Sequence, residues 1–156
     1  AGTGRPVALV NGVKTVMVNE TLIAGTKSFS DWFLFGRRLE PAARLAGGAL
    51  SIEPNESRAL EVHALALAQL GRLAEARNAF LALLRAAPEA PVSRNNFGVF
   101  ELQQGNAAAA ARLFKDAVDL DPSNLDGYRG LKEAATLLQR DDLLQFAERG
   151  IGRLTR

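Results

Sequence analysis

Apolar residues recur at helical intervals along residues 57–122, and glycine and proline interrupt them at regular places. Leu60, Ala64 and Leu67 lie three or four residues apart before Gly71, and similar spacing resumes after it. Residues at these intervals share one face of an α-helix. The glycine predicts a turn, and the next proline ends the second helix because it lacks a backbone donor and clashes with the preceding turn. The pattern therefore predicts pairs of helices.

The pattern repeats every 34 residues. Identical residues stand at this spacing in four sets, namely Pro54, Pro88 and Pro122, then Gly71 and Gly105, Ala76 and Ala110, and Phe80 and Phe114. The small alanines permit close approach of two helices, and the phenylalanines fill the space between neighbouring hairpins. A single hairpin of this kind cannot bury both of its faces, so several must stack for stability.

These residue types and their spacing resemble the tetratricopeptide repeat family. The family places a small residue at position 8 of a 34-residue repeat, Gly at 15, Ala at 20, an aromatic residue at 24, Ala at 27 and Pro at 32. With position 1 at Ser57, the chain departs from this pattern at Leu83, and with position 1 at Pro91 it matches throughout.

The resemblance weakens towards both ends of the chain. An earlier, degenerate second helix is indicated by Ala42, Ala46, Ala49 and Pro54. A later first helix is indicated by Tyr128 and Leu131, whereas Gln139, Leu144 and Glu148 miss the pattern and suggest a terminal capping pair. The resemblance implies an all-α fold, a right-handed α-solenoid of about three to four repeats over residues 27–156.

Residues 1–26 stand outside the repeat. Residues 7–18 are rich in β-branched side chains around Asn11 and Gly12, a dipeptide typical of a hairpin turn. We expect either an ordered strand or hairpin, or a loosely extended segment, and the sequence leaves both open. Residues 28–35 are dense in aromatic side chains, and we expect them to begin the first helix. A hydrophobic plug over the first repeat is favoured over an exposed partner site.

Composition excludes several classes of function. The 156 residues contain no cysteine and carry a formal net charge of +2, so thiol chemistry is excluded and nucleic-acid binding is not indicated. No run of 18 apolar residues is present, and we expect no membrane span. Frequent Ala, Leu, Arg and Gly with few Lys is typical of proteins from GC-rich bacteria. The sequence does not distinguish the bacterial cytoplasm from the periplasm.

Groups suited to catalysis are scattered along the chain. His63, the one histidine, stands at a repeat position that normally packs, so a structural role is favoured. A phosphate loop would require glycines where Ala8 and Val13 stand. Asp141 and Asp142 begin a helix, where negative charge favours the helix dipole. We expect no enzyme, no catalytic residue, no metal site and no cofactor.

The resemblance implies a concave groove, lined by the first helix of each repeat, that binds another protein or a peptide. By register, the groove positions are Arg58, Glu61, Val62, Leu65, Ala68 and Gln69, then Val92, Asn95, Asn96, Val99, Leu102 and Gln103, with Arg129 from the last repeat. Asn96 is suited to bracketing a peptide backbone, because an amide both donates and accepts, although Asn95 or Asn96 can equally cap or cross-link helices.

Members of the family that bind chaperone C-termini have basic or amide side chains at set positions. This chain has Glu61, Leu65, Asp126 and Gly130 at four of them, so such a receptor is not indicated. A groove of apolar and amide side chains instead predicts an extended segment with small or apolar side chains.

Two hypotheses from different classes follow. The first is a non-catalytic scaffold that binds an extended or helical segment of a partner in a bacterial pilus, secretion or envelope assembly. The alternative is a self-assembling structural protein, a homo-oligomer in which residues 5–22 pair with a strand of a neighbouring copy or fill its groove.

Overall fold

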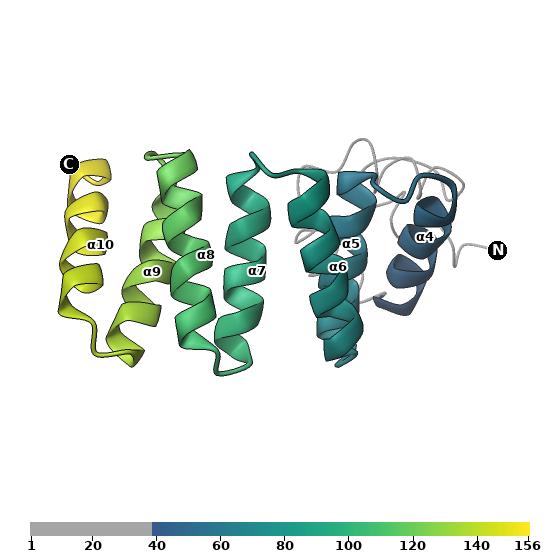
Figure 1. Cartoon of the computed structure of the whole chain (residues 1–156), viewed down its shortest axis with the longest axis horizontal. Coiled ribbons are helices and arrows are strands. Elements are labelled where there is room, and N and C mark those ends of the chain that lie inside the picture. Colours follow the sequence, from purple (N-terminus) through teal and green to yellow (C-terminus); the bar gives the residue numbers. More distant parts are fainter. Residues whose placement is uncertain (1–38) are drawn as a thin grey trace. The chain divides into compact units, whose positions relative to one another are not determined.

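The computed structural model describes residues 39–156, and this part of the chain consists of seven α-helices without a strand (Figure 1). The helices are α4 (Leu39–Ile52), α5 (Ser57–Gln69), α6 (Leu73–Ala86), α7 (Pro91–Gln103), α8 (Ala107–Leu120), α9 (Leu125–Leu137) and α10 (Asp141–Leu154). The all-α solenoid prediction is confirmed. The predictions for residues 1–26 and 28–35 lie outside the described residues.

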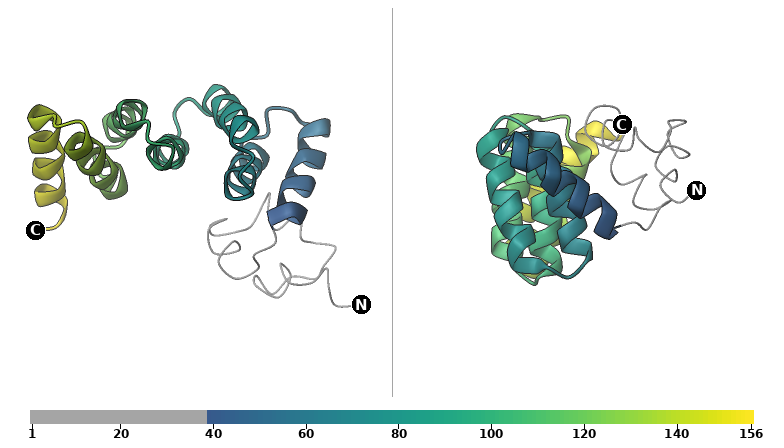
Figure 2. Two further views of the ribbon diagram at one scale, coloured as in Figure 1. Left: turned by 90° about the horizontal axis from the view of Figure 1, so that it is seen from below. Right: turned by 90° about the vertical axis from the view of Figure 1, so that its right-hand side faces the viewer.

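The chain divides into two compact units, Ala1–Ala86 and Ala87–Arg156, here called unit 1 and unit 2. Unit 1 contains α4, α5 and α6, and α5 packs against both of the others. Unit 2 contains α7 to α10, in which each helix packs against the next and α7 also contacts α9 (Figures 1 and 2).

Helix boundaries follow the 34-residue register along the whole described part. First helices begin at residues 57, 91 and 125, and second helices at residues 39, 73, 107 and 141. The predicted starts at Ser57 and Pro91 are confirmed. The degenerate repeats at both ends keep the same register, so helix lengths are retained where the typical residues are lost.

The turn inside each hairpin has one conformation. Gly71 and Gly105 have φ of 77° and 78°, and Gln139, at the same register position, has φ of 55°. The N–H of the residue after each of them donates to the carbonyl five residues earlier, as Asn106 does to Glu101 at 2.9 Å. This is the Schellman ending of an α-helix, which requires a left-handed residue.

His63 joins α5 to α4 in unit 1. Its side chain is half-buried, and Nδ1 donates to the carbonyl oxygen of Ala43 at 2.9 Å. The ring lies over Gly47, where an added Cβ would be 3.4 Å from the imidazole. The histidine therefore links two helices, which is the structural role predicted for it.

Phe114 of α8 is the centre of the core of unit 2. Its side chain is 1% exposed and packs with Ala110, Leu131 and neighbouring alanines. An added Cβ at Gly98 of α7 would lie 2.9 Å from the ring, and one at Gly130 of α9 would lie 2.4 Å from it. Glycine on both helices lets the ring sit directly against their backbones.

Candidate functional site

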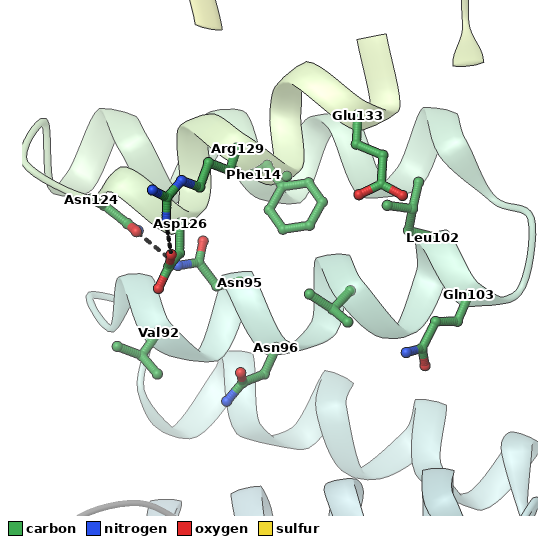
Figure 3. A pocket seen from close by; sticks show the side chains of 12 residues that line it. Val92, Asn95, Asn96, Leu102, Gln103, Phe114, Asn124, Asp126, Arg129 and Glu133 are labelled. Carbon is green, nitrogen blue, oxygen red and sulfur yellow. Dashed lines mark hydrogen bonds and ion pairs between the residues drawn. The ribbon is translucent and has the colours of Figure 1, made fainter. Parts of the chain in front are cut away.

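A hollow of about 640 Å³ lies between α7 and α9 of unit 2, with Phe114 of α8 beneath it (Figure 3). We call it the unit 2 groove. Its lining consists of Val92, Asn95, Asn96, Val99, Leu102, Gln103, Phe114, Asn124, Asp126, Arg129, Gly130 and Glu133.

The α7 wall of the groove is neutral. Val92, Asn96, Val99 and Gln103 stand four, three and four residues apart, so they lie along one face of the helix. Val92 is 59% exposed and Val99 46%. Two exposed valines that alternate with two amides form an apolar stripe with hydrogen-bonding groups beside it.

The α9 wall carries the charges. Asp126, Arg129 and Glu133 occupy one face of α9, with Gly130 between the last two. Arg129 Nη1 lies 3.6 Å from Asp126 Oδ1, and both side chains are mostly exposed. In Figure 3, Arg129 points to Asp126, whereas Glu133 points away from this pair into the groove. Exposed pairs of this kind contribute little to stability, about 0–1 kcal/mol.

Asn95 braces the two walls. Its Nδ2 donates to Asn124 Oδ1 at 2.9 Å, and the same oxygen accepts the N–H of Gly127 at 2.9 Å, which caps α9 (Figure 3). Asn95 Oδ1 is buried and has no hydrogen-bond partner in the described part of the chain. The amide of Asn95 therefore cross-links helices, which is one of the two roles the sequence allows for it.

The structure brings six of the eleven predicted binding residues into the groove, namely Val92, Asn95, Asn96, Val99, Gln103 and Arg129. The other five belong to α5 of unit 1. There Arg58 and Gln69 are exposed, Glu61 and Leu65 are half-buried, and Val62 is buried at 3% exposure. A binding role for all eleven stays a prediction.

On α9, sequence reasoning named Asp126 and Gly130 only as departures from the chaperone-binding pattern, and it missed Glu133. Asp126, Gly130 and Glu133 stand 34 residues after Val92, Asn96 and Val99, so the same register carried one repeat further identifies them. Phe114 and Asn124 had no such signal, because neither stands at a groove position of its repeat.

Residues 39–156 contain neither a group of metal ligands nor a helix that could span a membrane. No three His, Cys, Asp or Glu side chains in this part are grouped so that they could hold a metal ion. None of the described helices is long and apolar enough to cross a membrane.

Known structures share this fold. A MamA RS-1 ArsTM double mutant matches with a TM-score of 0.74 and 15% identity over 96% of this chain and 89% of that one. MamA AMB-1 matches with a TM-score of 0.70 and 17% identity, over 99% of this chain and 87% of that one. MamA 41-end from Desulfovibrio magneticus RS-1 matches with a TM-score of 0.66 and 16% identity, over 90% of this chain and 82% of that one. At such identities the likeness shows the fold alone.

Comparison of sequences gives the family. A search of curated proteins found no match. The tetratricopeptide repeat model matches residues 34–91 and 61–124, which together span more than half of the chain. The chain therefore belongs to the tetratricopeptide repeat family.

Proposed function

We propose that this chain is a non-catalytic interaction scaffold that binds an extended segment of a partner protein in the unit 2 groove. The observation that carries the proposal is the row of two exposed valines on α7, which alternate with the amides of Asn96 and Gln103 and face a hollow of about 640 Å³. Exposed apolar side chains gathered at a hollow are typical of binding surfaces.

The dimensions support an extended ligand. The 13 residues of α7 span about 20 Å at 1.5 Å per residue, which equals about six residues of extended chain at 3.3 Å each. Asn96 and Gln103 carry amides that pair with both the N–H and the C=O of a backbone. Val92 and Val99 supply apolar contacts for side chains of such a segment.

We further propose that residues 27–156 act as the solenoid domain and residues 1–26 as a separate segment. The frequent Ala, Leu, Arg and Gly support a bacterial context, and we propose pilus, secretion or envelope assembly as the setting. This assignment rests on composition and on the scaffold character of the fold.

Affinity purification from the source organism tests the binding role. The tagged wild-type chain should retain a partner that Val99→Arg loses, since a charge then stands in the apolar stripe. Leu81→Arg on α6 is the matched control, because Leu81 is 41% exposed and lies outside the groove. Asn96→Ala should weaken retention without unfolding the chain. Equal retention by wild type and Val99→Arg contradicts the proposal.

The self-assembling alternative has one observation in its favour. Residues 7–18 contain a single charged residue, Lys14, among mostly small or β-branched side chains, which suits the apolar and amide wall of α7. Light scattering of the full chain and of the chain lacking residues 1–26 tests it. An oligomer that becomes a monomer on deletion supports self-assembly, and an unchanged mass rejects it.

A further inference from the structure

We propose that the unit 2 groove selects a partner segment by one basic side chain, and that Glu133 is the residue that binds it. The inference rests on the proposed function and adds the chemistry of the partner. The occupant is an internal, extended segment of another protein with one Lys or Arg among small apolar residues.

The charged side chains of the groove include more carboxylates than cations. The lining contains two carboxylates, Asp126 and Glu133, and one guanidinium, that of Arg129. Arg129 lies 3.6 Å from Asp126, so these two charges largely offset each other. Glu133 has no hydrogen bond or ion pair within residues 39–156, and the α7 wall is neutral. One uncompensated negative charge therefore faces the groove.

The surface beside Glu133 has room for a long side chain. Gly130 stands three residues before Glu133 on the same helix face. Only glycine fits at this position, because an added Cβ would lie 2.4 Å from the ring of Phe114. This leaves room along α9 between Arg129 and Glu133. Leu102 lines the groove across from α9. The methylene groups of a Lys or Arg can pack along such apolar surface while the charged end reaches a carboxylate.

The same arrangement rejects acidic ligands. A free C-terminal carboxylate or an acidic side chain would meet Glu133 with like charge. Arg129 does not compensate, because Asp126 already lies beside it. The groove therefore favours a segment from within a chain over a C-terminal chain end.

Titration of the ¹⁵N-labelled full chain with capped synthetic peptides tests the proposal by NMR. Three nonapeptides share small apolar and hydroxyl side chains and differ only at the centre, which is Lys, Ala or Glu. We expect the Lys peptide to bind about 5-fold tighter than the Ala peptide, as one exposed ion pair allows, and the Glu peptide to bind more weakly than both. Added salt should reduce the difference.

Two variants assign the effect to one residue. Glu133→Gln should bind the Lys and Ala peptides equally, and it should fold normally because Glu133 is exposed. Asp116→Asn is the matched control, since Asp116 is an exposed carboxylate of α8 outside the groove, and it should keep the 5-fold preference.

The outcomes separate the two proposals. Equal affinity for the three peptides, with shifts on α7 and α9, overturns the choice of a basic side chain and leaves the proposed function standing. No binding of any of them overturns both. A fourth peptide, with the sequence of residues 7–18, is titrated in the same way. If it alone binds, the occupant is a second copy of the chain, and the assignment to a foreign partner is wrong.

Discussion

The left-handed turn residues give the sharpest test of the fold. Gly71, Gly105 and Gln139 occupy the same register position, and all three have positive φ. An added Cβ at Gly105 meets no atom within 4 Å, so Gly105→Ala changes the backbone preference without a clash. The left-handed conformation costs a non-glycine residue about 1–2 kcal/mol. Alanine recovers about 0.4–1 kcal/mol by restricting the unfolded chain. We expect a net loss of about 1 kcal/mol.

Gln139→Gly is the reciprocal change. Glycine at this position removes the cost of the left-handed conformation at φ of 55°, and it also makes the unfolded chain more flexible. The first effect is larger, so we expect the free energy of unfolding to rise by about 0.5–1 kcal/mol. Gly152→Ala is the control. Gly152 lies within α10 and has open space around an added Cβ, so alanine should stabilise the helix by about 0.5–1 kcal/mol.

Urea unfolding followed by far-ultraviolet circular dichroism measures all three variants. Repeat proteins do not always unfold in a single step, so midpoints are compared along with extrapolated free energies. The urea midpoint should be lowest for Gly105→Ala, higher for the wild type and highest for Gln139→Gly. The reasoning is refuted if Gly105→Ala is as stable as the wild type, or if Gln139→Gly is less stable than it.

Three more outcomes follow from unit 2. Phe114→Ala should cost about 3–5 kcal/mol through the cavity it leaves, and an unchanged melting temperature would contradict the described core. Asn124→Ala should cost about 1 kcal/mol, because the N–H of Gly127 loses its cap, and urea midpoints measure this. The guanidinium of Arg140 lowers the pKa of Asp142 from 3.8 to about 2. Because this pKa is depressed on folding, the stabilisation is full above about pH 4 and is lost as the pH falls through about 2. Asp142→Asn should flatten the pH dependence in that window, and an unchanged slope would count against the pair.

The helix boundaries could be predicted because the register repeats. Placing position 1 at Ser57 and Pro91 gave helix starts that the structure has. Each proline that follows a second helix stands two residues beyond the helix end, as its missing donor requires. Local chemistry and register agree at these positions, so the sequence alone is sufficient.

Other features depend on contacts that the register does not encode. Gln139 has poor intrinsic preference for positive φ, and packing of α9 against α10 sets its conformation instead. The pairing of Asn95 with Asn124 joins residues 29 positions apart and depends on the rotamers of both. The burial of Val62 depends on neighbouring side chains and could not be read from its groove position.

The place of Phe114 under the groove divides this surface into a fixed part and a variable part. Its ring is shared with the core and is held against Gly98 and Gly130, so a change in any of the three requires compensation from the others. Val99 and Glu133 extend from the walls into solvent, where substitution leaves the core intact. New binding preferences can therefore evolve on the walls one residue at a time, while the floor is inherited with the fold.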